Sequence, residues 1–194
     1  RKEDKRFITG KGKYTDDVKN DHQCYAAFVR SPHAHAKVKG IDKSAAEAMD
    51  GVAAVLDGHQ LTGDGIGNII CGWMIHSKDG SPMKMGAWSA LATDTVRYAG
   101  DAVAVVIADT PANARTAAEA VAVDYEELPA IVSPVDALAD GAPQIHPEAE
   151  GNLIYDWEIG EKEATEAAIA GAAYVCEMEI TNNRVAPNPM EPRS

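Results

Sequence analysis

Cysteine is scarce in this chain, and its three occurrences are far apart. They stand at positions 24, 71 and 176, and no CxxC pair is present. A disulfide scaffold and a local zinc or iron–sulfur site are disfavoured, because both need several closely spaced thiols. We expect buried structural cysteines and a reducing compartment, which predicts a cytoplasmic protein.

Long apolar runs and an excess of basic residues are also lacking. Without a run of about 18 apolar residues the sequence predicts no transmembrane span, and no signal peptide is visible. Because the sequence begins with Arg1 rather than methionine, we expect the natural N-terminus to lie further upstream. The net charge of −12 argues against nucleic acid as a partner, since phosphates would be repelled.

The acidic excess lies in the final part of the chain. Residues 1–123 carry 15 acidic and 15 basic groups, whereas residues 124–194 carry 15 acidic and three basic groups. A proline- and alanine-rich stretch follows this change, and proline favours a connector with short helical turns. The sequence therefore predicts a first domain at 1–130, a linker at 131–150 and the beginning of a second domain at 151–194.

Strand and helix patterns alternate along the chain. Thr110 can cap a helix that starts at Pro111, where a missing N–H costs nothing, and alanines then fall on one face of that helix. The alternation predicts an α/β (α+β) fold of two layers with a mixed sheet. Strands are expected at 24–31, 35–41, 52–56, 95–98, 102–108, 121–125, 153–157 and 174–181, and helices at 42–50, after 110 and at 162–170.

Residues 58–91 have many glycines and no clear periodicity. This composition predicts a long surface loop. Long loops are often functional or form interfaces. A tolerated insertion is an equally good interpretation.

The residues themselves form no self-sufficient catalytic set. His33 and His35 would share the face of a strand, but two ligands do not make a metal site, and a structural role is favoured. The glycines around Lys11 and those at 63–67 match neither phosphate-binding loop pattern and are interpreted as turns. No GxSxG or HExxH pattern occurs. The residues alone therefore predict no catalytic residue and no metal ligand.

Several blocks of the sequence fit one known pattern. They are RFITGKGKYTDD at 6–17, FVRSPHAHA at 28–36, RYAGDAVA at 97–104, VDYEELPA at 123–130, and NNR at 182–184 followed by PNPMEPR at 187–193. Together and in this order they resemble the large subunits of molybdenum hydroxylases, the xanthine dehydrogenase and aldehyde oxidase family. Within that family, the aerobic carbon monoxide dehydrogenase-like large subunits resemble the blocks most.

The resemblance implies a fold and an activity. The first domain would be an α/β hammerhead, which is mainly structural, and a truncated molybdopterin-binding domain would follow it. The family's enzymes are oxidoreductases that hydroxylate or oxidise a carbon centre (carbon monoxide, an aldehyde or an N-heterocycle) with water as the oxygen source. Molybdopterin would be bound mostly by residues outside this chain, so that this fragment alone would be inactive.

The resemblance also implies partners and one site residue. FAD and two-iron two-sulfur clusters would sit on a medium and a small subunit, and the intact enzyme would be a dimer of heterotrimers. The family often places a glutamine near the metal's oxo ligand, just before the Pro-x-Pro-x-Glu stretch, and Asn183 occupies that position here. Asparagine keeps the amide donor but has a shorter reach, and hydrogen bonding at a strand edge by Asn182 and Asn183 is the competing interpretation.

A noncatalytic role is the alternative to an enzyme. A module with the same fold would bind or assemble partner subunits through residues 58–91 and the basic start of the chain, 1–13. The reading frame after Ser194 distinguishes the two hypotheses. A long continuation with glycine-rich pterin loops favours the enzyme, and an early stop favours the module.

Overall fold

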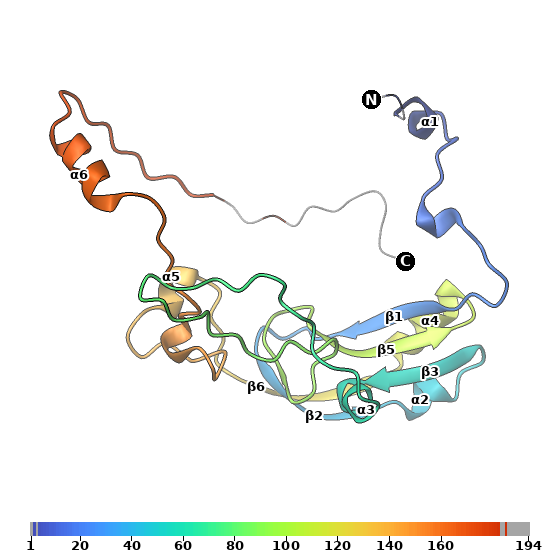
Figure 1. The fold of residues 1–194 in the computed structure, drawn as a ribbon. Coiled ribbons are helices and arrows are strands. Elements are labelled where there is room, and N and C mark those ends of the chain that lie inside the picture. Colours follow the sequence, from blue (N-terminus) through green and yellow to red (C-terminus); the bar gives the residue numbers. More distant parts are fainter. Residues whose placement is uncertain (1, 3, 183–184, 186–194) are drawn as a thin grey trace. The chain divides into compact units, whose positions relative to one another are not determined.

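The computed structural model of the chain describes residues 2, 4–182 and 185 (Figure 1). Contacts divide the chain into two units, Cys24–Glu158 on one side and Arg1–Gln23 with Ile159–Ser194 on the other. All six strands found in the described residues belong to the unit Cys24–Glu158. None of the described helices is long and apolar enough to span a bilayer.

The first sheet is built around its most apolar strand. β5 (Ala102–Ala108) pairs antiparallel with β1 (Tyr25–Arg30) on one side and with β3 (Val52–Asp57) on the other (Figure 1). A strand with neighbours on both edges and packing on both faces reads as a nearly continuous apolar run. The buried residues of β5 are Val103, Ala104, Val106 and Ala108.

The second sheet has the order β4-β2-β6, with β2 (Ala36–Asp42) between β4 (Thr95–Val96) and β6 (Ala122–Glu127). Every pairing in both sheets is antiparallel. The α/β fold class is confirmed, but the predicted mixed sheet is wrong. A helical crossover within one sheet makes its strands parallel, whereas here the crossover after β5 delivers β6 to the other sheet.

That crossover is α4 (Pro111–Glu119), and its start follows the predicted capping. The Thr110 side chain accepts a hydrogen bond from the Asn113 N–H at 3.1 Å, and Pro111 is the first helical residue. Ala114 and Ala117 are buried, and the helix packs against β1 and β5. The small alanine side chains allow this close approach of helix and sheet.

The two sheets share one interior. One buried cluster contains Val55 and Val106, and the other contains Val96 and Val103. Val29, Ile41 and Val123 pack against both clusters. The two sheets are therefore joined by continuous apolar packing.

Two short helices flank β3. α2 (Ser44–Glu47) precedes it, and Asp42 Oδ1 accepts a hydrogen bond from the Ser44 N–H at 3.0 Å near the start of α2. α3 (Gly58–Gly63) follows β3, with the Asp57 side chain accepting from the Gln60 N–H at 2.9 Å. Apart from α3, the stretch 58–91 has no helix and no strand, as predicted for a loop.

The two ends of the 58–91 loop lie in contact. A Cβ placed on Gly58 would come within 2.7 Å of Leu91 O and 2.8 Å of Ala92 O, which leaves room only for glycine. Leu91 itself is 2% exposed. The loop therefore leaves the packed interior and returns to it at one place.

Two predicted strands are wrong. Residues 153–157 form no strand, although the N–H groups of Lys84 and Lys78 donate to Ile154 O at 2.9 Å and Asp156 O at 2.8 Å. Those two bonds join the segment to an irregular loop instead of a sheet. Residues 174–181 also form no strand, because no strand in the described residues pairs with them.

The remaining elements are helical and short. α6 (Lys162–Ala170) has the predicted bounds, and no residue of it is buried. The other helical segments are α1 (Asp4–Ile8), η1 (Thr15–Asp17), α5 (Pro134–Ala137) and η2 (Glu150–Asn152).

Candidate functional site

The residues singled out from the sequence are not brought together as a site. Asn183, the predicted cofactor contact, lies outside the described residues, and Asn182 is exposed. All three cysteines are exposed and none is in a disulfide, so the expectation of buried cysteines is wrong.

A polar junction does form around the connection between β1 and β2. Ser31 is 3% exposed and His35 is 8% exposed. Ser31 N–H donates to Asp101 O at 2.8 Å, and Gly100 N–H donates to Ser31 O at 2.8 Å. The Ser31 hydroxyl accepts from the His33 N–H at 3.0 Å. These contacts bind the end of β1 to the turn that leads into β5.

The two histidines of the junction hold the end of β6. His35 Nδ1 lies 2.7 Å from Pro129 O, and because a carbonyl only accepts, Nδ1 carries the proton. His33 Nδ1 lies 3.3 Å from Glu127 Oε1. Thus the two histidines contact different groups and do not converge on one point, which agrees with the structural role favoured from the sequence.

Further polar contacts extend the junction to the segment after β6. Asp101 Oδ2 accepts from the Arg97 N–H at 3.1 Å, and Arg97 Nε donates to Ile145 O at 3.2 Å. Burial lowers the pKa of the neighbouring His146, and the positive charge of Arg97 lowers it further. The neutral form of His146 is therefore favoured beside Arg97.

Tyr125 places a buried hydroxyl next to this junction. Burial raises the pKa of Tyr125, and the nearby Ser31 hydroxyl offsets the rise only in part. The Tyr125 hydroxyl oxygen meets no partner of hydrogen-bonding geometry among the described residues, since Ser31 Oγ is bonded to the backbone of His33. Its ring packs edge-on against His33, with centroids 4.9 Å apart.

The junction is suited to holding strands in register. Ser31, His35 and Arg97 each bond to the backbone of a neighbouring segment. Among the described residues, no three His, Cys, Asp or Glu side chains are grouped to hold a metal ion.

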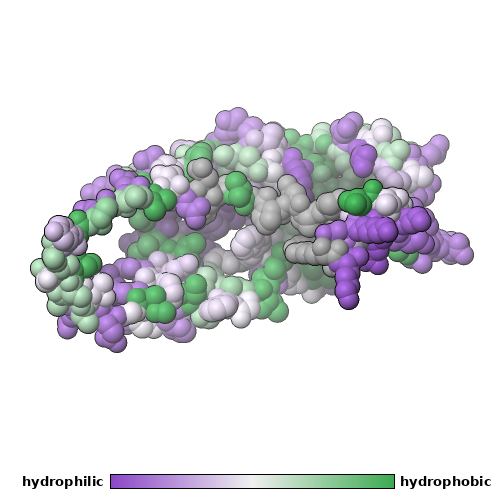
Figure 2. Space-filling view, turned by 90° about the horizontal axis from the view of Figure 1, so that it is seen from above, coloured by the Kyte–Doolittle hydropathy of each residue, from purple (hydrophilic) through white to green (hydrophobic). Residues whose placement is uncertain are grey.

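Exposed hydrophobic side chains are the other notable surface feature. Within the 58–91 loop, Trp73 is 79% exposed, Trp88 is 65% exposed and Ile70 is 89% exposed. Figure 2 shows hydrophobic residues at the surface among hydrophilic ones. Exposed apolar groups in such number are typical of surfaces that other polypeptides cover. Other exposed hydrophobic side chains are those of Ile66, Ile69 and Met74 in the same loop and of Val132, Val135, Leu138 and Trp157 outside it.

Known proteins are similar to this chain in fold and in sequence. Residues 9–129 match the family model described as aldehyde oxidase and xanthine dehydrogenase, a/b hammerhead domain. The chain belongs to this family. The predicted resemblance to molybdenum hydroxylase large subunits is therefore confirmed.

Curated relatives agree with the family model. The carbon monoxide dehydrogenase large chain of Hydrogenophaga pseudoflava is 38% identical over 98% of this chain and 24% of its own length. The nicotine 6-hydroxylase large subunit of Paenarthrobacter nicotinovorans is 34% identical over 100% of this chain and 23% of its own length. The sequence thus spans about a quarter of the length of these relatives.

Solved structures confirm the fold. A reconstituted carbon monoxide dehydrogenase from Oligotropha carboxidovorans has a TM-score of 0.69 and 35% identity, over 90% of this chain and 22% of that one. The quinoline 2-oxidoreductase of Pseudomonas putida 86 has a TM-score of 0.66 and 34% identity, over 75% of this chain and 18% of that one. The hammerhead fold predicted from the resemblance is confirmed.

The junction was missed as a unit by reasoning from the sequence. Apart from Ile145 and His146, its residues fall in the blocks at 28–36, 97–104 and 123–130, which carried the resemblance. The signal was that three distant blocks match one family pattern. The structure shows that these three blocks meet, through the contacts of Ser31 with residues 100–101 and of His35 with Pro129.

Proposed function

We propose that this chain is the N-terminal part of the large subunit of a molybdenum–pterin oxidoreductase. The intact enzyme hydroxylates or oxidises a carbon centre, in carbon monoxide, an aldehyde or an N-heterocycle, with water as the source of oxygen. The observation that carries the proposal is the hammerhead match over residues 9–129, together with relatives of which this sequence spans about a quarter. The described fold contributes a scaffold to that enzyme.

In this proposal, molybdopterin is bound mostly by residues outside this chain. This sequence spans only about a quarter of the length of its curated relatives. The proposal therefore assigns molybdopterin to residues outside the sequence, with Asn183 as a contact from this chain. The residues 151–194 are proposed as the beginning of the molybdopterin-binding domain, after a hammerhead at 1–130 and a linker at 131–150.

Partner subunits complete the proposal. FAD and two-iron two-sulfur clusters would reside on a medium and a small subunit, in a cytoplasmic dimer of heterotrimers. The exposed tryptophans and isoleucines of the 58–91 loop support burial against other polypeptide. The burial of Trp73 and Trp88 in the assembled protein is a direct consequence.

The test uses the intact large chain expressed with its genetic neighbours. Metal analysis is expected to find molybdenum, and turnover in isotopically labelled water is expected to place the label in the product. An intact protein without molybdenum, FAD or turnover that still binds its partner subunits would show the noncatalytic module instead.

Asn183 is tested by paired variants of the same assembly. Asn183→Ala is expected to lower kcat while the molybdenum content is retained, and Asn183→Gln, which carries the amide that the family often has, is expected to retain activity. Asn182→Ala is the matched control and should leave kcat unchanged. Equal effects of the two alanine variants would instead support hydrogen bonding at a strand edge.

A further inference from the structure

β3 lies at an open edge of the first sheet. It pairs with β5 on one side, and the sheet order β1-β5-β3 leaves its other side without a strand among the described residues. An edge strand carries a row of backbone N–H and C=O groups that can pair with another chain. Ala53 of this edge strand falls in a register shift between Val52 and Ala54, and its side chain is exposed.

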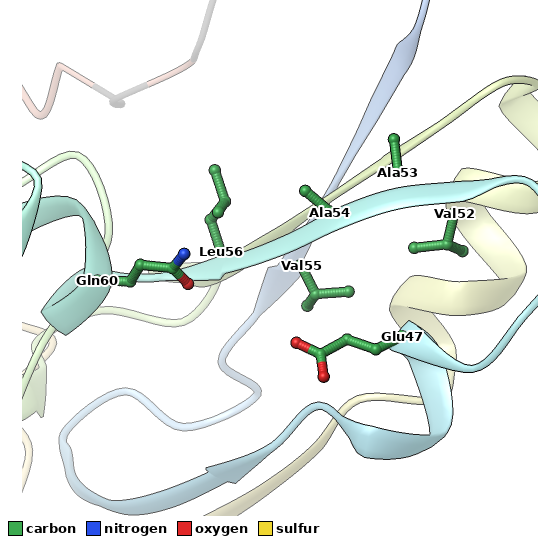
Figure 3. A pocket seen from close by; sticks show the side chains of 7 residues that line it. All are labelled: Glu47, Val52, Ala53, Ala54, Val55, Leu56 and Gln60. Atoms are coloured by element: carbon green, nitrogen blue, oxygen red, sulfur yellow. The ribbon is translucent and has the colours of Figure 1, made fainter.

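A cavity follows this edge. It has a volume of about 240 Å³. Successive side chains of a strand point to opposite faces, so a cavity lined by every residue from Val52 to Leu56 runs along the edge of the strand. Gln60 of α3 lies at one end of the cavity, and the Glu47 side chain reaches from α2 to a position beside the strand, as Figure 3 shows.

One carboxylate, that of Glu47, determines the charge of this cavity, which is called the groove below. Lys43 Nζ lies 2.8 Å from Asp57 Oδ2 and 3.3 Å from Gln60 Oε1, so its charge is already paired. Glu47 is exposed and forms no ion pair with any described residue. In Figure 3 its carboxylate lies beside Val55, near the middle of the strand. The groove thus combines small apolar walls with one unpaired negative charge.

From these observations we infer that the β3 edge docks an extended segment of another polypeptide, which adds a strand beside β3 and places a lysine or arginine opposite Glu47. Main-chain hydrogen bonds supply affinity in this mode of recognition, and pockets for alternate side chains supply specificity. The alanines and valines of β3 leave room for small or β-branched side chains of the added strand. This inference does not depend on the molybdenum chemistry.

A second copy of the chain fits the groove less well. Antiparallel pairing of two β3 strands about a twofold axis would bring two Glu47 carboxylates to the same stretch of the interface. Like charges facing one another across strands are destabilising. Charge complementarity therefore favours a different polypeptide with a basic residue.

The experiment measures hydrogen exchange in the intact large chain with two peptide probes. Both are acetylated strands of alternating valine and threonine, one with a central lysine and the other with a central glutamate. The lysine probe is expected to slow exchange of the backbone amides of 52–57 and to bind more tightly than the glutamate probe. Glu47→Gln is expected to weaken binding of the lysine probe by about two- to fivefold, the range for an exposed ion pair.

Matched variants separate the edge from the rest of the protein. Ala53→Lys puts a charged residue on the open edge and should abolish binding of the lysine probe. Ala26→Lys, at an exposed alanine of β1 on the opposite edge of the same sheet, should leave binding unchanged.

Four results would overturn the inference. The first is slow exchange of 52–57 in the intact chain without any probe, which means that its own residues cover the edge. The second is equal binding of the two probes. The third is an equal loss of binding in Ala26→Lys. The fourth is a dimer of the intact chain that Ala53→Lys dissociates, which makes a second copy the occupant.

Discussion

α4 and α6 are helices of equal length and similar composition with different surroundings. Both have nine residues and are rich in alanine. In α4, Ala114 and Ala117 are buried against the first sheet, whereas no residue of α6 is buried. The sequence pattern indicates a helix in both places, but only α4 has a sheet against its alanine face, and packing of that kind supplies most of the stability of a short helix.

The largest contrast between the two helices is expected from a buried charge. Ala117→Asp places a carboxylate at a position with 0% exposure inside an apolar cluster, and should cost about 3 kcal/mol or more. Ala167→Asp, on the exposed α6, should change stability by less than about 0.5 kcal/mol. Native-state hydrogen exchange of the two helices in the intact protein measures both effects. A similar cost at both sites would show that α6 is packed as α4 is.

A second contrast compares two glycines of α3. Gly58→Ala forces a Cβ onto the backbone of Leu91 and Ala92, and is expected to cost about 1–3 kcal/mol. Gly63→Ala meets no atom within 4 Å and should be neutral or stabilising by up to about 1 kcal/mol. Exchange of the β3 and α3 amides reports the difference. If Gly58→Ala is harmless, the close approach of the two loop ends is wrong.

The starts of the two long helices provide a smaller effect. Thr110→Ala removes the cap on the Asn113 N–H and should destabilise α4 by about 1 kcal/mol. Glu161 makes no side-chain cap at α6, so Glu161→Ser should slow amide exchange in the first turn of α6. Thr110→Ser, which keeps the hydroxyl, is the control for α4. Faster exchange in the serine variant of α6 would contradict the assignment of its start.

The smallest expected effect concerns pH at the start of α3. Burial raises the pKa of Asp57, but hydrogen bonds from Lys43 and the Gln60 N–H outweigh it and bring the pKa below its ordinary value of 3.8. As pH falls, Asp57 is protonated in the unfolded chain before it is protonated in the folded chain. The stabilisation is therefore complete above the pKa of Asp57 in the unfolded chain and is lost as pH falls through its lower pKa in the folded chain. Exchange of the α3 amides as a function of pH measures this loss. Asp57→Asn should remove the pH dependence, and its persistence would assign it to another group.

Strong local signals predicted much of the packed unit. β5 was predicted with its observed bounds because an apolar run between turns indicates a buried strand, and α4 was predicted from its cap and proline. The strand directions were not predictable, since nothing local to α4 specifies which sheet receives β6. The strand predicted at 174–181 failed because an apolar pattern does not supply a partner strand, and none of the described strands pairs with it.

The candidate site was predictable only as a resemblance. The blocks at 28–36, 97–104 and 123–130 identified the family, but their shared role at the polar junction needed the fold. His35, for example, is defined by its contact with Pro129, which is 94 residues away. The exposure of the cysteines was also unpredictable, because thiols are usually buried and no local pattern marks these three as exceptions.

The close contact of Gly58 with the backbone of Leu91 affects how the sequence of the 58–91 loop can change. Because the two ends of the 58–91 loop lie in contact, the residues between them can be lengthened, shortened or exchanged while β3 and β4 keep their partner strands. Contacts that the loop makes with other segments would have to be rebuilt, among them the bonds of Ser77, Lys78 and Lys84 with residues 154–156. The 58–91 loop can thus acquire residues that bind a different polypeptide without any change in the two sheets.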